Sequence, residues 1–262
     1  MSCGRTSRPT TSNRHSRISP TGRGALGDAE TIAAAAPRKN ADLPVRVASA
    51  AVMLAVAIGA LIAGDPWLDL FIGAVVLVGF GELVRLVWKA TPNLALRLGG
   101  IAFGVAYMGI AGLVMSRLPV PLVIGLVGTV ICIDTFAYFT GRALGGPKIA
   151  PSISPSKTWA GLLGAIIGAT LWLVIWVAAV RYPMTGSMLP QFDMIDMSQI
   201  LFIGPLAAVC AQAGDFFESW LKRKAGEKDS SQLIPGHGGV FDRIDGMIPA
   251  ALLAGALLGG AG

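Results

Sequence analysis

Residues 119–140 read PVPLVIGLVGTVICIDTFAYFT, an apolar run in which Asp134 is the only charged side chain. About 20 such residues in a helix cross the ~30 Å hydrocarbon core of a bilayer. Comparable apolar runs lie at residues 46–64, 67–88, 98–116, 160–180, 199–220 and 247–262. Seven segments of this kind, of which the last is short and rich in glycine, leave almost no amphipathic helix to cover them in water. The sequence therefore predicts an all-α polytopic integral membrane protein with about seven transmembrane helices.

The composition supports this class of protein. Charged residues make up only 14% of the 262 residues, whereas a soluble domain carries about 25%. The net charge of +6 could indicate a nucleic-acid partner, but the basic residues lie between apolar runs rather than along one soluble face, so we expect no nucleic acid. Three cysteines without metal spacing and only two histidines exclude a disulfide framework and a multi-histidine metal site.

Residues 1–44 are polar and rich in Arg and Ser, and their first acidic residue is Asp28. We expect a disordered basic N-terminal tail here, with an organelle transit peptide as the alternative. Residues 45–262 are then the transmembrane domain.

The basic residues also predict an orientation, because cytoplasmic loops of membrane proteins are enriched in Lys and Arg. If the N-terminus is cytoplasmic and all seven runs span, only Arg117 and Arg181 of the 21 basic residues lie outside. We therefore expect a multi-pass protein of the inner (plasma) membrane with its N-terminus in the cytoplasm. The two polar loops, 141–159 and 221–246, then lie on the cytoplasmic side.

The sixth apolar run ends in a group of polar residues. Asp215, Glu218 and Ser219 follow one another at i, i+3 and i+4 and so share one face of a helix. Acidic residues at a membrane helix usually face a cavity or a partner. For Glu218 a salt bridge to Lys222 is an equally good interpretation, whereas Asp215 indicates function.

The loop that follows combines basic residues, glycines and a second carboxylate pair. Its charged side chains are Lys222, Arg223, Lys224, Lys228 and Asp229. A flank that binds anionic head groups would explain the basic residues, but not Gly236-His237-Gly238-Gly239 or the Asp242-Arg243-Ile244-Asp245 that comes next.

This pattern suits nucleotide chemistry. Mg²⁺ takes oxygen ligands, commonly carboxylates together with substrate phosphates, and Lys and Arg neutralise phosphates. Glycines allow backbone N–H groups to approach such a ligand. A Ser/His/Asp hydrolase built on Ser219 or Ser230 with His237 is less suitable, because the nucleophile-elbow context is absent.

Two further polar groups accompany the fourth and fifth runs. Asp134, Tyr138 and Arg142 share a helix face, which either lines the site or holds an Asp134–Arg142 interaction bridged by Tyr138. Ser156 and Lys157 lie just before the fifth run, where the helix N-terminus favours anions. Thr158 needs no role beyond capping that helix.

The segment GDFFESWLKRKAGEKDSSQLIPGHGGVFDRIDG at 214–246 closely resembles the signature of the phosphatidate cytidylyltransferases, also called CDP-diacylglycerol synthases. DTFAYFTGR (134–142) and SPSKTWAG (154–161) resemble two other segments of that family. The resemblance covers roughly residues 45–262. It implies a polar site inside a multi-helix membrane fold, with Mg²⁺ and a monovalent cation such as K⁺ beside it.

Matched residue by residue, the resemblance assigns the metal to Asp215 and Asp242. The residues expected to carry the chemistry are Asp215, Asp242, Lys222, Arg223, Lys228, Asp229, His237, Arg243 and Asp245. Those expected to bind substrate are Asp134, Arg142, Ser156, Lys157, Ser219, Gly238 and Gly239. The expected partners are CTP, phosphatidic acid and membrane lipids, and a homodimer is one expected assembly.

Two departures from the family stand out. Ala160 occupies a position where the family usually has Glu, in K-T-x-E-G. Family members also often have more apolar helices near the start, so we expect that one or two N-terminal helices are missing here.

The implied reaction joins CTP to phosphatidic acid, giving CDP-diacylglycerol and pyrophosphate in phospholipid biosynthesis. A cytidylyltransferase acting on another lipid phosphate, such as an isoprenoid ether lipid, is the first alternative, and a transporter is the second. Head-group transferases that consume CDP-diacylglycerol fit poorly, because their D-G-x2-A-R pattern is absent.

Overall fold

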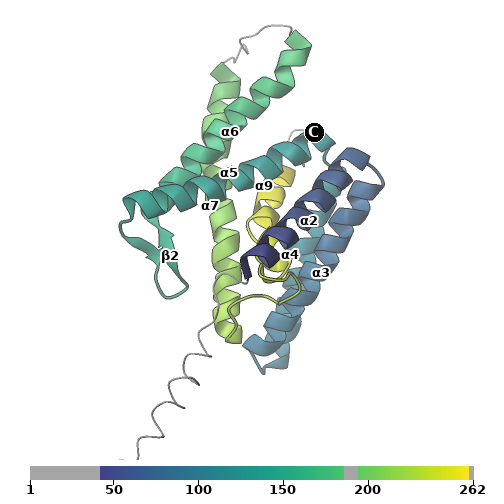
Figure 1. The fold of residues 1–262 in the computed structure, drawn as a ribbon, viewed down its shortest axis with the longest axis vertical. Helices are drawn as coiled ribbons and strands as arrows, with labels where there is room; N and C mark the ends of the chain where they lie inside the picture. The colour runs from purple at the N-terminus through teal and green to yellow at the C-terminus, as the bar shows by residue number, and fades with distance from the viewer. Residues whose placement is uncertain (1–41, 186–193, 260–262) are drawn as a thin grey trace, which may run out of the picture. The chain divides into compact units, whose positions relative to one another are not determined.

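The computed structural model describes residues 42–185 and 194–259 of the chain (Figure 1). Its helices and strands, in chain order, are α2 (Asp42–Ala63), α3 (Trp67–Ala90), α4 (Leu94–Arg117), α5 (Val120–Leu144), β1 (Lys148–Ala150), β2 (Ser154–Thr158), α6 (Trp159–Thr185), α7 (Met194–Ala225), α8 (Phe241–Ile244) and α9 (Met247–Gly259). The last three residues of the predicted N-terminal tail, 42–44, belong to α2, and the rest of that tail lies outside the described residues.

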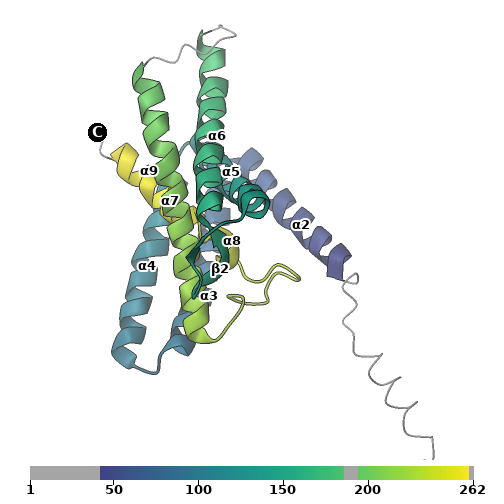
Figure 2. The ribbon, with the colours of Figure 1, turned by 90° about the vertical axis from the view of Figure 1, so that its left-hand side faces the viewer.

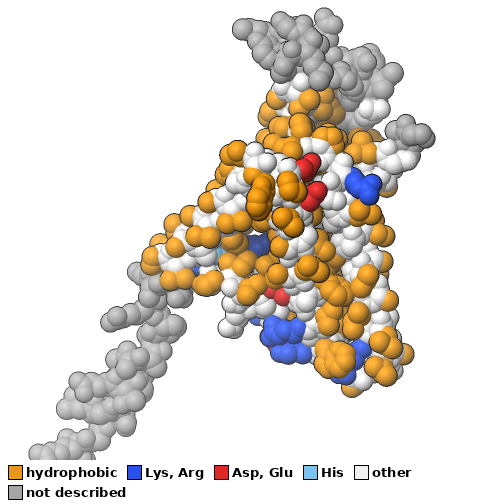
Figure 3. Space-filling model, turned by 90° about the vertical axis from the view of Figure 1, so that its right-hand side faces the viewer, with side chains coloured by type: hydrophobic (Ala, Val, Ile, Leu, Met, Phe, Trp, Pro, Cys, Tyr) orange, Lys and Arg blue, Asp and Glu red, His pale blue; other side chains and the backbone are white. Residues whose placement is uncertain are grey.

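Among the described residues, six helices are long and apolar enough to cross a membrane. A helix of 24 residues, such as α3 or α4, is about 36 Å long at 1.5 Å per residue. The seventh predicted run forms α9, whose 13 residues reach only about 20 Å. Hydrophobic side chains cover most of the described surface on the face drawn in Figure 3, as expected of helices in contact with lipid. The prediction of an all-α polytopic membrane protein is confirmed.

Side chains at the helix starts explain two of the boundaries. Asn93 precedes α4, and its Oδ1 accepts hydrogen bonds from the backbone N–H groups of Ala95 (2.9 Å) and Leu96 (3.3 Å). Thr158 precedes α6, and its Oγ1 accepts one from Gly161 at 3.0 Å. Such bonds satisfy the free N–H groups of a first helical turn. The predicted capping role of Thr158 is confirmed.

The helices α5 and α6 pack closely because small residues lie where they cross. A Cβ at Gly164 would overlap the side chain of Thr140, and one at Gly168 would overlap Phe136. Small residues of this kind let membrane helices approach one another. The adjoining core includes the buried residues Ile133, Ala165, Ala169, Ala207, Ala208 and Ala211, which tie α5 and α6 to α7. This arrangement fixes α7, which lies beside α6 in Figure 2, and with it the polar residues in the C-terminal half of α7.

A second core anchors the loop after α7. Leu83 and Leu86 of α3 pack with Met108 of α4, Phe241 of α8 and Ile248 of α9. Phe241 is only 1% exposed, so it holds the loop that precedes α8 against the bundle.

The polar loop 141–159 contains a structure that the sequence patterns did not predict. β1 and β2 form an antiparallel hairpin in which Lys148 pairs with Thr158 and Ala150 with Ser154. The hairpin turns the chain back toward α7, and Lys157 of β2 contacts Asp215 of that helix. A strand of five residues rich in Ser, Pro and Lys carries no strong β-propensity, so its pairing depends on this tertiary setting.

Candidate functional site

Three carboxylates meet beside the C-terminal half of α7. One oxygen from each of Asp215, Glu218 and Asp245 lies within 4.8 Å of the others. Asp215 and Glu218 come from one turn of α7, whereas Asp245 lies between α8 and α9. The two segments can approach closely because Gly214 has no side chain. A Cβ at this position would overlap the backbone carbonyl of Asp245. We call Asp215, Glu218 and Asp245 the acidic cluster.

Two lysines contact the acidic cluster, one from β2 and one from α7 itself. Lys157 of β2 forms an ion pair with Asp215 and donates a hydrogen bond of 2.8 Å to Oε1 of Gln212. Lys222 of α7 lies 2.6 Å from Oε2 of Glu218, which confirms the salt bridge considered from the sequence. Burial, followed by the nearby charge of Asp215, raises the pKa of Asp245 to about 7, because both effects disfavour the ionised form of this carboxyl group.

The acidic cluster has the properties of a cation site. Oε1 of Glu218 is buried and has no hydrogen-bond partner among the described residues, and a buried carboxylate oxygen without a partner is costly. All three side chains offer the hard oxygen ligands that Mg²⁺ and similar ions take. A divalent cation therefore fits the residues present.

Asp242 lies in a different environment, surrounded by hydrogen-bond donors. Its side chain is 5% exposed and lies 2.8 Å from Nζ of Lys222. It also accepts hydrogen bonds from the backbone N–H of Ser230 (2.9 Å), the hydroxyl of Ser230 (2.9 Å) and the backbone N–H of Gly239 (2.8 Å). Burial alone would raise the pKa of Asp242, but the hydrogen bonds around it, including those from Lys222 and these two N–H groups, hold the pKa well below its usual range.

The predicted glycine segment passes directly over Asp242. Gly238 has φ of +82°, a conformation that favours glycine. A Cβ at Gly238 would lie 2.7 Å from Oδ2 of Asp242. The glycines thus allow the backbone to approach a carboxylate of the protein itself.

A cavity of about 520 Å³ adjoins the acidic cluster. The predicted substrate-binding residues Asp134 and Arg142 of α5 and Ser156 and Lys157 of β2 line it, as does Asp215. Arg142 donates a hydrogen bond of 2.8 Å to the hydroxyl of Tyr138. The structure therefore brings the three sequence segments with predicted polar roles to one cavity.

Other predicted residues lie away from the acidic cluster. His237 lies on the loop, with Nδ1 2.9 Å from the hydroxyl of Ser49 in α2, and its carbonyl accepts a hydrogen bond of 2.8 Å from Arg243. Arg223 is exposed and donates to the carbonyl of Ile153 at the tip of the hairpin, at 3.4 Å. Ser219 makes a long contact of 3.4 Å with Asp215.

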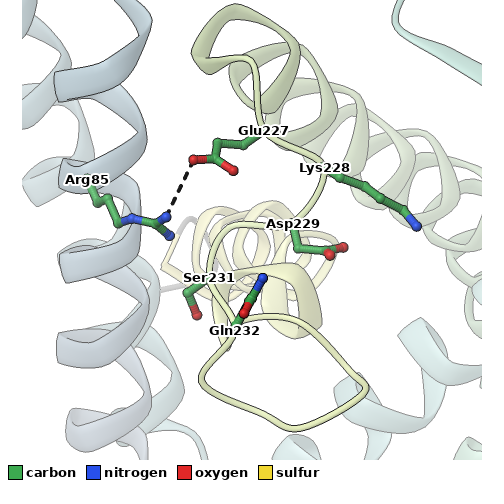
Figure 4. Close-up of a pocket in the computed structure, with 6 residues that line it drawn as sticks. All are labelled: Arg85, Glu227, Lys228, Asp229, Ser231 and Gln232. Carbon is green, nitrogen blue, oxygen red and sulfur yellow. Dashed lines mark hydrogen bonds and ion pairs between the residues drawn. The ribbon is translucent and has the colours of Figure 1, made fainter. Parts of the chain in front are cut away.

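Lys228 and Asp229 line a separate polar pocket of about 460 Å³ beside α3. Figure 4 shows Arg85 of α3 joined to Glu227 in this pocket, with the side chain of Lys228 directed away from that pair. These two predicted residues are exposed and belong to a different surface from the acidic cluster.

Sequence reasoning did not assign Gln212 or Glu82 to the site. Gln212 precedes Asp215 by one turn and binds Lys157, a position that the i, i+3 spacing could have indicated. Glu82 is a buried acidic residue in the second apolar run, and a buried charge in such a run is costly unless it has partners.

The helical membrane fold and the carboxylate-rich site are those of a polytopic membrane protein with a candidate cation site. Sequence comparison identifies its family. The chain belongs to the cytidylyltransferase family, whose profile matches residues 102–259. The chain is similar to the phosphatidate cytidylyltransferase of Brucella abortus, at 38% identity over 192 residues, covering 69% of this chain and 64% of that protein.

More distant relatives share the same name. The phosphatidate cytidylyltransferase of Helicobacter pylori is 37% identical over 156 residues, covering 59% of this chain and 53% of that protein. That of Thermotoga maritima is 32% identical over 115 residues, covering 44% and 40% respectively. The chain thus spans less than two thirds of the length of these relatives.

Proposed function

We propose that this protein is a phosphatidate cytidylyltransferase, which transfers the cytidylyl group of CTP to phosphatidic acid. The observation that carries the proposal is the acidic cluster, flanked by Lys157 and Lys222, in a bundle of membrane-length helices. Such a site can receive a polyphosphate together with a cation, while the bundle admits a lipid. The family and the names of the relatives support the same reaction.

In this reaction an oxygen of the phosphatidic acid phosphate forms a bond to the α-phosphorus of CTP. The bond between the α- and β-phosphates breaks, and pyrophosphate leaves with the electron pair. The attacking phosphate is already anionic, so the protein needs no strong general base. Catalysis then depends on orienting the two phosphates and neutralising their charge.

The chain's own cationic groups suit this task. Lys157, Arg142 and Lys148 all border the cavity next to Asp215, and we infer that they bind the phosphates of CTP. Lys222, which bridges Glu218 and Asp242, is placed to balance charge when the phosphates arrive. Arg223, Lys228 and Arg243 lie further out and would contribute through the basic character of the loop.

We further infer that Asp215, Glu218 and Asp245 hold Mg²⁺. When bound, this ion would neutralise charge on the nucleotide phosphates and on the departing pyrophosphate. The expectation from the family signature, that Asp242 also contributes and that K⁺ binds nearby, remains a prediction.

The site end of the bundle is proposed to face the cytoplasm, with the protein in the inner (plasma) membrane. Arg85 and Lys89 at the end of α3 contact Glu227 of the loop after α7, and Arg97 at the start of α4 contacts the carbonyl of Trp88. This end therefore gathers basic side chains, as cytoplasmic faces do, and it is the side on which CTP is available.

The test is turnover of labelled CTP by the purified full-length protein in lipid nanodiscs with phosphatidic acid. We expect labelled CDP-diacylglycerol and an equal amount of pyrophosphate, both dependent on Mg²⁺. An isoprenoid ether lipid phosphate serves as the competing acceptor. Preferred turnover of that lipid would contradict the proposed acceptor, and an absence of lipid-dependent pyrophosphate release would contradict the proposed reaction.

A further inference from the structure

Glu82 is a buried acidic residue near the middle of α3, and its side chain reaches the loop after α7. The residue is 6% exposed. It lies outside the residues 102–259 that match the family profile, and none of the patterns in the sequence assigned it a role. A charge at such a position is costly unless donors surround it.

The loop places two backbone N–H groups and two hydroxyls around this one carboxylate. Oε2 of Glu82 accepts a hydrogen bond from the backbone N–H of Phe241 at 2.7 Å and lies 2.9 Å from the hydroxyl of Ser230, whose single proton it shares with Asp242. Oε1 accepts from the backbone N–H of Val240 at 3.1 Å and from the hydroxyl of Ser231. Both ends of the 230–241 segment are therefore fixed to the same side chain of α3.

The same contacts extend to Asp242. The hydroxyl of Ser230, which is fully buried, lies 2.9 Å from Oε2 of Glu82 and 2.9 Å from Oδ2 of Asp242. The backbone N–H groups of Ser230 and Gly239 also donate to Asp242. Ser230 and Gly239, two of the residues that hold Asp242, thus lie in the segment that Glu82 fixes.

The backbone at Gly239 and the side chain of Phe241 are both tightly packed next to Glu82. A Cβ at Gly239 would overlap both the hydroxyl of Ser230 and the carboxylate of Glu82. Phe241, whose N–H binds Glu82, is buried in the core formed with Leu83 and Leu86 of α3. The loop can keep these contacts only while Glu82 presents two acceptor oxygens.

We propose that Glu82 is a positioning residue for the site: through Ser230 and the backbone at 239–241 it sets the place of Asp242 and of Lys222, which binds Asp242. Its effect on loop order follows from the contacts alone, whereas its effect on turnover rests on the proposed function. Glu82 itself would touch neither substrate.

The first test is Glu82→Gln in the full-length protein. Glutamine has one acceptor oxygen, so its NH₂ group must face either the Val240 or the Phe241 N–H, and a donor is left unpaired. We expect kcat to fall about 10- to 100-fold, as is typical when a residue that orients a ligand-binding group is lost. The KM for phosphatidic acid should stay within about threefold. Hydrogen–deuterium exchange of peptides covering 228–242 should become faster, without change in α5 and α6.

Two other variants make the result specific. Lys89→Gln removes another contact between α3 and the loop, the exposed ion pair with Glu227, and should leave kcat and exchange at 239–241 unchanged. Ser230→Ala keeps Glu82 but removes the hydroxyl that lies between the two carboxylates. Because both changes interrupt one connection, Glu82→Gln with Ser230→Ala should cost little more than Glu82→Gln alone.

The outcomes separate this proposal from the proposed function. Unchanged exchange at 228–242 in Glu82→Gln would overturn the positioning role, whatever the activity. Faster exchange throughout the bundle would overturn it as well, since Glu82 would then support the whole fold; if that variant does not fold, exchange and kcat of Ser230→Ala decide. Wild-type protein without CTP turnover would contradict the proposed reaction, while the exchange experiment would still decide the role of Glu82.

Discussion

The ammonium group of Lys222 lies 2.6 Å from Oε2 of Glu218 and 2.8 Å from Oδ1 of Asp242. This single side chain therefore joins the acidic cluster to the second carboxylate centre at Asp242. Both carboxylates are buried, with 2% and 5% of their side chains exposed, so their charges need a partner that solvent does not supply.

Replacing Lys222 by glutamine should be the most damaging change among the lysines of α7. Glu218 and Asp242 would lose their shared cation, and the two carboxylates would repel one another in a medium of low dielectric. We expect turnover of CTP to fall by about two orders of magnitude and the melting temperature to fall as well. Steady-state kinetics and thermal unfolding in detergent measure both effects.

Lys224→Gln is the matched control, because Lys224 is an exposed residue on the same turn of α7. Its turnover should stay within about twofold of wild type. A Lys222→Gln variant that is equally active would show that the contacts of Lys222 with Glu218 and Asp242 have no part in the reaction.

The proposed orientation predicts a labelling pattern for single cysteines. In a variant without Cys3, Cys132 and Cys210, cysteines at the exposed positions Ser152 and Gln232 should resist a membrane-impermeant thiol reagent in intact cells. A cysteine at the exposed position Arg117, at the opposite end of α4, should react. Permeabilised cells, in which all three positions should react, provide the control. Reaction at Ser152 from outside would reverse the orientation.

The departure at Ala160 gives a third prediction. Ala160 is a half-buried residue in the first turn of α6, three residues after Lys157. A carboxylate in a first turn interacts favourably with the helix dipole, and the family usually has Glu here. We expect Ala160→Glu to keep or raise turnover, with Ala160→Gln as the uncharged control. Lost turnover in folded Ala160→Glu would show that the alignment of this segment with the family needs revision.

The parts of the site that the sequence predicted are those set by regular helical spacing. Asp215 and Glu218 share a face of α7 because residues three apart do so in any helix, and both belong to the acidic cluster. Asp242 and Asp245 have the same spacing, but the chain changes from α8 to α9 beside them. One therefore contacts Lys222 and the other joins Asp215, a difference that residue spacing alone does not predict.

Contacts between distant segments were beyond the reach of the sequence patterns. Glu82 binds Phe241, which is 159 residues away, and nothing local in either segment specifies that pairing. The β1–β2 hairpin likewise depends on its surroundings, because SPSKT reads as a loop that leads into a helix. The sequence shows only that Glu82 is an acidic residue within an apolar run, and such a residue needs partners when it is buried.

The last prediction concerns the cation and compares three carboxylates. Asp215→Asn and Asp245→Asn each replace one carboxyl group of the acidic cluster by a neutral amide of nearly the same shape. We expect each to weaken Mn²⁺ binding, measured by electron paramagnetic resonance without substrates, and to reduce turnover by about two orders of magnitude or more. Because the two residues would act through one ion, the double variant should cost far less than the product of the single effects.

Asp242→Asn makes this prediction discriminating, because Asp242 is held by Lys222 and by the N–H groups of Ser230 and Gly239. If the acidic cluster alone holds the ion, Asp242→Asn should lower kcat while Mn²⁺ binding stays close to wild type. If Asp242 is also a ligand, as the family signature implies, Mn²⁺ binding should weaken as much as in Asp215→Asn. Unchanged Mn²⁺ binding in both Asp215→Asn and Asp245→Asn would remove the acidic cluster as the cation site, since neither residue could then be a ligand.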